Sequence, residues 1–147
     1  MRRHRPKLRK RAVIVADTSV WIDFFNGAAT PERATLRGLV ANSPSQLVIP
    51  DLVMFEVLRG FRHERQQRLA LSAFHALNVR SVVDRTGAQR AAERYRHLRA
   101  AGITIDSPID VLVASYCIDQ DLTLLQRDRD FLPFEQHFGL RLLQPMH

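Results

Sequence analysis

Four acidic residues stand at the ends of apolar segments that are far apart in the sequence. Asp17 and Asp128 each follow a short apolar run, whereas Glu56 and Asp110 stand among apolar residues with helical spacing. An ionised carboxylate beside a buried face is costly unless it is paired, hydrogen-bonded or bound to a cation. Two carboxylates about 4 Å apart repel each other by roughly 4 kcal/mol at an effective dielectric constant of about 20. If the four side chains converge, they therefore need a cation.

Such a cluster predicts metal-dependent chemistry on phosphate. Ligands that are all oxygens, with no Cys or His, select hard ions, here Mg²⁺ with Mn²⁺ as the alternative. A metal in that setting activates water for in-line attack on phosphorus and stabilises the leaving oxygen. We expect Asp17 and Asp110 to hold the metal most directly. Glu56 and Asp128 would complete its shell or orient the attacking water.

Each carboxylate also has a purely structural interpretation, which the sequence leaves open. Asp17 and Asp128 could simply begin the helices that follow them. Glu56 could lie at the rim of the core and pair with Arg59. Asp110 stands three residues after Ser107, so that it could complete a capping box with Asp in the place of Glu. Capping and metal binding are not exclusive, so both roles remain open for Asp110.

The segments that must position these residues alternate between strand and helix patterns. Parallel strands that are buried on both faces read as short continuous apolar runs, as residues 13–16 do. Residues 46–49, 79–83, 122–125 and 140–143 are the four further strand candidates. Helical patterns lie between them, at residues 18–25, 31–40, 51–59, 62–77, 85–101, 108–118 and 131–138. This alternation predicts a three-layer α/β/α domain with a central, mostly parallel five-stranded sheet. Ligands of such folds bind beyond the carboxyl ends of the strands, where Asp17 and Asp128 are expected.

The charge of the chain is concentrated at its beginning. The 147 residues include 22 Lys and Arg against 15 Asp and Glu, a net charge of +7. Residues 2–11 hold seven of the cations, so residues 12–147 are formally neutral. We therefore divide the chain into a basic tail, residues 1–11, and one domain, residues 12–147. Such a basic block is typically disordered and often contacts nucleic acid, although an incidental extension is the alternative.

Several classes of site are excluded by what the sequence lacks. The single cysteine, Cys117, and the scattered histidines predict neither a disulfide framework nor a zinc site. No Gly-rich loop of the nucleotide-binding types is present. The only lysines, Lys7 and Lys10, lie in the tail, which argues against receiver domains and haloacid-dehalogenase-type phosphatases. No segment approaches the roughly 20 apolar residues that cross a membrane, so we expect a cytoplasmic protein.

Four stretches together resemble the acidic motifs of PIN-domain ribonucleases, and in order, spacing and total length those of the VapC toxins of toxin–antitoxin pairs. The stretches read Val-Ala-Asp17-Thr-Ser-Val-Trp-Ile-Asp, Glu56-Val-Leu-Arg-Gly, Ile-Asp110-Val-Leu-Val-Ala and Leu-Leu-Gln-Arg-Asp128-Arg-Asp130-Phe. The likeness covers residues 12–143, and although no single motif is specific, four in order are. It implies that Asp17, Glu56, Asp110 and Asp128 form a Mg²⁺-binding catalytic quartet, with Asp130 nearby.

Two features depart from the pattern of that family. Gln126 stands two residues before Asp128, where the family often has Thr or Ser, and the basic start lies outside the usual pattern. Asp23, in the same expected helix as Asp17, lies outside the quartet. Its replacement is expected to change activity little.

The resemblance implies a Mg²⁺-dependent endoribonuclease that acts as a toxin, forms a homodimer and is covered at its acidic site by a cognate antitoxin. Two alternatives are a PIN-like module that binds RNA without cutting it, and a metal-dependent DNA nuclease. Acidic residues at all four motifs disfavour the binding module. The residues alone do not separate RNA from DNA as the substrate.

Overall fold

The strands of the domain form two parallel ladders. The strands are β1 (Ile14–Ala16), β2 (Ile49–Pro50), β3 (Val79–Arg80), β4 (Thr123–Leu125) and β5 (Arg141–Leu142). One ladder has the order β1-β4-β5 and the other pairs β2 with β3. A bridge between Ile14 and Leu47 joins the two. The computed structural model describes residues 12–145, so the basic tail, predicted to be disordered, lies outside the described residues.

The α/β class predicted from the sequence is confirmed, but the expected single five-stranded sheet is divided into ladders of three and two strands. The second strand is displaced because Pro44–Gln46 forms a 3₁₀ turn, and Pro50, which has no N–H, ends the strand that remains. The third strand covers two residues rather than five. Short apolar runs therefore predicted where strands lie better than how long they are.

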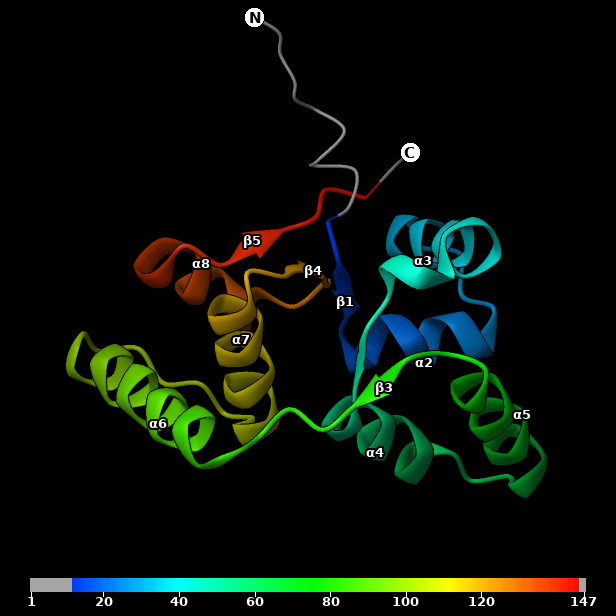
Figure 1. Cartoon of the computed structure of the whole chain (residues 1–147), viewed down its shortest axis with the longest axis horizontal. Helices are drawn as coiled ribbons and strands as arrows, with labels where there is room; N and C mark the ends of the chain where they lie inside the picture. The colour runs from blue at the N-terminus through cyan, green and yellow to red at the C-terminus, as the bar shows by residue number, and fades with distance from the viewer. Residues whose placement is uncertain (1–11, 146–147) are drawn as a thin grey trace, which may run out of the picture.

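The helices follow the sequence patterns closely. They are α2 (Thr18–Asn26), α3 (Pro31–Asn42), α4 (Asp51–Gly60), α5 (Glu64–His75), α6 (Arg85–Ala100), α7 (Pro108–Gln120) and α8 (Leu132–Phe138), with a 3₁₀ turn, η2 (Arg129–Phe131), before α8. Helices α6, α7 and α8 lie on one side of the strands and α2 to α5 on the other (Figure 1). Among the described residues, no helix is long and apolar enough to cross a membrane.

Local signals set several helix ends. The side chain of Thr30 accepts a hydrogen bond from the N–H of Arg33 at 3.1 Å, and that of Ser107 accepts one from the N–H of Asp110 at 3.3 Å. Gly27 ends α2 with a φ of 72°, a conformation that glycine adopts without strain. The helices that carry the acidic residues thus begin where the sequence predicts.

An aromatic cluster holds α2 in place. Trp21 is fully buried, and its ring centroid lies 5.2 Å from that of Phe74 on α5 and 5.9 Å from that of Phe25. Phe25 and Phe74 contact each other at 5.7 Å. Because α2 begins directly after Asp17, this packing also fixes the direction in which the chain leaves β1.

Candidate metal centre

Asp17 lies at the carboxyl end of β1 and is almost completely buried, with 4% of its surface exposed. Its N–H donates to the carbonyl of Leu125 at 2.9 Å, which places the ends of β1 and β4 side by side. The side chain makes no capping hydrogen bond to α2 within the described chain, although its backbone occupies the N-cap position. Ser19 Oγ donates to Oδ2 at 3.3 Å, whereas Oδ1 is buried without a hydrogen-bond partner among the described residues. The structural role considered for this residue, capping, therefore does not account for its carboxylate.

Glu56 reaches the start of α2 from α4. Thr18 Oγ1 donates to Glu56 Oε1 at 2.6 Å, across 38 residues of sequence. The pairing with Arg59 that the sequence suggested is also present, with 3.7 Å between Arg59 Nη2 and Glu56 Oε2. The Arg59 side chain is 61% exposed, so this pair contributes little to stability. Thr18 is thus the group that orients Glu56.

Asp110 occupies the first turn of the buried helix α7 and is 8% exposed. Its N–H takes part in the cap with Ser107, while its carboxylate faces the residues that follow β4. One carboxylate oxygen each of Asp110, Asp128 and Asp130 lie within 4.8 Å of one another. Capping and clustering therefore coexist at this residue.

The segment of residues 126–130, called here the acidic loop, is shaped by its own hydrogen bonds. Gln126 Oε1 accepts from the N–H of Asp128 at 2.5 Å, and Asp128 Oδ1 accepts from the N–H of Asp130 at 3.0 Å. Gln126 stands where the family often has Thr or Ser, and its side-chain oxygen accepts a hydrogen bond from the backbone of Asp128. Asp128 also begins η2, as its structural interpretation suggested.

The pKa of Asp17 is raised by burial and by the neighbouring carboxylates. Burial, with smaller contributions from the charges of Glu56 and Asp128, raises the pKa of Asp17 to about 6. The backbone N–H of Thr18 and, to a smaller extent, the hydroxyl of Ser19 act in the opposite direction and lower this pKa. Without a cation, this side chain is therefore still partly protonated at mildly acidic pH, where an ordinary aspartate is fully ionised.

The same causes act more strongly on Asp110. Burial and then the charges of Asp17, Asp128, Glu56 and Asp130 raise its pKa to about 7. All four predicted side chains, together with Asp130, therefore lie close enough to affect one another. Burial and the charge of Asp128 also raise the pKa of Asp130.

These residues fit a hard divalent cation. The donors are all carboxylate oxygens, and the buried Oδ1 of Asp17 lacks a partner among the described residues. Burial, and then the neighbouring carboxylates, raise the pKa values of Asp17 and Asp110, so a cation beside them would stabilise their ionised forms. Within the described chain, Arg59 is the one cation in ion-pair distance of this cluster, and it is mostly exposed. A divalent ion would supply the missing charge.

One contact near the site could not be read from the sequence. Asp23 is buried and forms a bidentate ion pair with Arg127, the residue before Asp128. The two residues are 104 positions apart, so no local pattern connects them. The sequence likewise indicates Thr18 only as a hydroxyl residue at the start of a helix, and not as the partner of Glu56.

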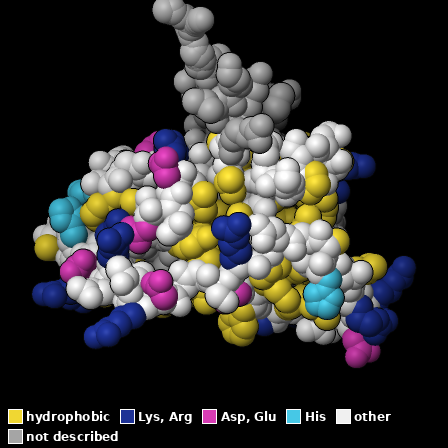
Figure 2. Space-filling view, in the orientation of Figure 1, with side chains coloured by type: hydrophobic (Ala, Val, Ile, Leu, Met, Phe, Trp, Pro, Cys, Tyr) yellow, Lys and Arg dark blue, Asp and Glu magenta, His cyan; other side chains and the backbone are white. Residues whose placement is uncertain are grey.

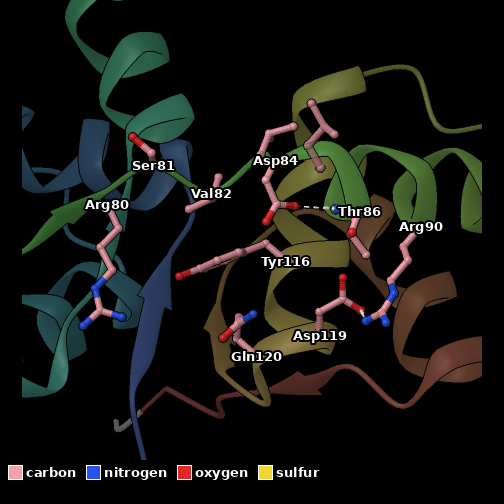
Figure 3. Close-up of a pocket in the computed structure, with 12 residues that line it drawn as sticks. Arg80, Ser81, Val82, Asp84, Thr86, Arg90, Tyr116, Asp119 and Gln120 are labelled. Carbon is pink, nitrogen blue, oxygen red and sulfur yellow. Dashed lines mark hydrogen bonds and ion pairs between the residues drawn. The ribbon is translucent and has the colours of Figure 1, made fainter.

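A separate cavity of about 410 Å³ lies between the segment after β3, the start of α6 and α7 (Figure 3). None of the four predicted acidic residues lines it. Arg90 lies 3.4 Å from Asp119, and Asp84 accepts from the N–H of Gly87 at 2.7 Å, while Arg80 also lines the cavity (Figure 3). Its charged lining is two arginines and two aspartates, so it is not a second cluster of carboxylates.

Comparison with known proteins agrees with this geometry. A family model described as PIN domain matches residues 14–134. The chain is 28% identical over 123 residues to the VapC ribonuclease Mb1587 of Mycobacterium bovis, covering 81% of this chain and 89% of the relative. The same identity and coverage hold for ribonuclease VapC11 of Mycobacterium tuberculosis.

Solved structures give the same fold. VapBC2 from Rickettsia felis, bound to a DNA fragment from its promoter, matches with a TM-score of 0.71 and 20% identity, over 91% of this chain and 99% of that one. VapC20 from Mycobacterium tuberculosis, a toxin that cleaves the sarcin–ricin loop, matches with a TM-score of 0.59 and 19% identity, over 85% and 95% of the two chains.

Proposed function

This chain belongs to the PIN domain family, and we propose that it is a metal-dependent endoribonuclease, the toxin of a type II toxin–antitoxin pair. The observation that carries the proposal is the acidic cluster: one carboxylate oxygen each of Asp110, Asp128 and Asp130 lie within 4.8 Å of one another, and the charges of Asp17 and Glu56 also act on Asp110. Asp17 adds a buried Oδ1 that has no partner within the described chain. Curated relatives of similar length that are named VapC ribonucleases support RNA as the substrate.

The residues divide the work as follows in this proposal. Asp17, Asp110 and Asp128 hold the metal, which is Mg²⁺ with Mn²⁺ as the alternative, because every donor is a carboxylate oxygen. Asp130 lies within reach of the same ion. Glu56, fixed by Thr18, orients the attacking water. A bound divalent ion supplies Lewis acidity toward a phosphate oxygen and lowers the pKa of a coordinated water.

We also propose a homodimer and a cognate antitoxin that covers the acidic site. The solved VapBC assemblies that share this fold are complexes of two proteins, which supports the second expectation. Light scattering of the chain alone and together with the protein encoded beside it would test both. A chain that is monomeric by itself and forms no complex with that protein would contradict both proposals.

The decisive experiment is cleavage of defined nucleic acids. The full chain is incubated with tRNA, rRNA and single-stranded DNA in Mg²⁺, in Mn²⁺ and in excess chelator. We expect endonucleolytic RNA fragments with either metal, none with the chelator, and no cleavage by Asp17→Ala or Asp110→Ala although circular dichroism remains native. Cutting of DNA alone would support a DNA nuclease instead. Metal-independent RNA binding without cleavage would support the binding module.

A further inference from the structure

We propose that the ion pair between Asp23 and Arg127 is a positioning device of the metal centre. It fastens the acidic loop, which carries Asp128 and Asp130, to the helix that begins after Asp17. This inference rests on the proposed function. It reverses the expectation from the sequence that the replacement of Asp23 changes activity little.

The geometry of the pair is that of a rigid fork. Arg127 Nε donates to Asp23 Oδ2 at 2.6 Å, and Arg127 Nη2 donates to Asp23 Oδ1 at 3.1 Å. Two parallel hydrogen bonds between planar groups fix orientation as well as distance. Asp23 is 7% exposed, so Arg127 also compensates a charge that would otherwise be buried alone.

Apart from the Asp23–Arg127 pair, the side-chain hydrogen bonds of the acidic loop among the described residues are internal to the loop. The ladder between β1 and β4 ends at the pair Ala16 and Leu125, and the N–H of Asp17 adds one more bond to the carbonyl of Leu125. Beyond that point, the side-chain bonds of Gln126 and Asp128 close the loop on itself. They shape the loop without tying it to α2.

The Asp23–Arg127 pair makes that tie. Asp23 lies six residues after Asp17 on α2, and Arg127 directly precedes Asp128. The pair therefore sets the separation between two predicted ligands that come from opposite ends of the chain. Displacing a catalytic group by about 1 Å can cost on the order of 100-fold in rate. Outer partners of metal ligands typically contribute 10- to 100-fold to affinity or activity.

The chain offers a matched control in the ion pair between Arg94 and Asp119. It also joins two elements, α6 and α7, with 2.8 Å between Nη2 and Oδ1. The Asp119 side chain is 11% exposed and that of Asp23 is 10% exposed, so the two aspartates are matched in burial. Asp119 also lies 3.4 Å from Arg90, so Asp119→Asn removes both of its ion pairs. Asp119 lies nine residues after Asp110 on α7, roughly 13 Å along the helix axis. Its loss should affect stability alone.

The experiment compares the full-length parent with Asp23→Asn, Arg127→Gln, the double variant and Asp119→Asn. The first readout is the Mg²⁺ concentration that gives half of the maximal rise in melting temperature, and the second is kcat and KM for RNA cleavage. We expect Asp23→Asn and Arg127→Gln each to raise the half-saturating Mg²⁺ about tenfold and to lower kcat at similar KM. The double variant should lose no more Mg²⁺ affinity and no more kcat than the more impaired of the two single variants, because the two residues act as a unit. Asp119→Asn should have a lower melting temperature than the parent but the same half-saturating Mg²⁺ concentration and the same kcat.

Four outcomes decide the matter. Parental Mg²⁺ affinity and kcat in Asp23→Asn would make the pair merely structural and overturn the inference. A salt-sensitive rise in KM for Arg127→Gln alone would show that Arg127 contacts RNA, which also overturns it. If Asp23→Asn does not fold, Arg127→Lys decides, since it keeps the charge but not the fork, and unchanged Mg²⁺ affinity in it would refute the pair's role. A parent that binds Mg²⁺ but cleaves no RNA would overturn the proposed function, while the melting data would still decide the role of the pair.

Discussion

At the scale of single residues, the buried carboxylates make stability depend on pH. The pKa values of Asp17, about 6, and Asp110, about 7, lie above the ordinary value of 3.8. Between about pH 4 and 7 the folded, metal-free protein therefore binds more protons than the unfolded chain, so its free energy of unfolding falls as the pH rises. This contribution is fully present below about pH 4 and is lost above about pH 7.

Metal binding should have the opposite dependence on pH, because a carboxylate must be ionised to act as a ligand. We expect the rise in melting temperature caused by Mg²⁺ to be small at pH 5 and largest near pH 8. Melting curves across this range, with Mg²⁺ and with chelator, measure the difference directly. An effect of Mg²⁺ that is the same at both ends of the range would contradict the assignment of Asp17 and Asp110 as ligands.

Removing one charge from the cluster tests the repulsion itself. Asp110→Asn keeps the backbone cap with Ser107 but removes one of the interacting charges, so the metal-free protein should be no less stable than the parent. In the parent, Mg²⁺ at about 100 times its dissociation constant should add roughly 2.7 kcal/mol. For a domain of this size that is on the order of 5–10 °C in melting temperature. Asp110→Asn should lose most of this shift, and a variant that retained it in full would remove Asp110 from the ligand set.

At the scale of elements, the sequence predicted whatever depends on neighbouring residues. Thr30, Ser107 and Gly27 mark helix ends because a cap is a contact over a few positions. The pattern of apolar residues did not predict the division of the sheet, because it does not show where the 3₁₀ turn at Pro44–Gln46 and Pro50 limit the second strand. A contact between distant residues leaves no such local signal: the motifs indicate the four acidic positions, but no residue near Asp23 in the sequence indicates its partner Arg127, 104 residues away.

The cap of α7 offers a test of how an element positions a site residue. Ser107→Ala removes the acceptor of the Asp110 N–H and should cost about 1 kcal/mol of stability, or a few degrees in melting temperature. Because Asp110 lies in the turn that the cap fixes, the half-saturating Mg²⁺ concentration should also rise. Thr30→Ala removes an equivalent cap from α3 and should lower the melting temperature alone. Equal Mg²⁺ affinity in the two variants would show that the first turn of α7 is held by other contacts.

At the scale of the whole molecule, we expect chemistry and substrate capture to lie on different parts of the chain. The acidic cluster repels RNA until a cation is bound, and residues 12–147 are formally neutral. Arginine side chains gather on the visible face over α6 and over α5, with hydrophobic side chains between them (Figure 2). Arg59, Arg68 and Arg90 are more than half exposed. The domain thus has cations that could meet phosphates, and the seven cations of residues 2–11 add a further set.

Deleting residues 2–11 separates these two sources of RNA affinity. If all seven tail cations met phosphates of single-stranded RNA, the logarithm of affinity would fall against the logarithm of salt concentration with a slope near −5, from about −0.7 per contact. This is an upper bound, since a basic segment rarely engages every charge at once. The deletion should therefore flatten the salt dependence and raise the apparent KM. It should leave kcat nearly unchanged, because binding that is equal in the ground state and the transition state does not lower the chemical barrier.

Titration of fluorescent RNA between about 50 and 200 mM salt, with and without the tail, measures both slopes. Identical slopes would assign RNA capture to the arginines of α4, α5 and α6 instead, and Arg59→Gln with Arg68→Gln would then become the variants that raise KM.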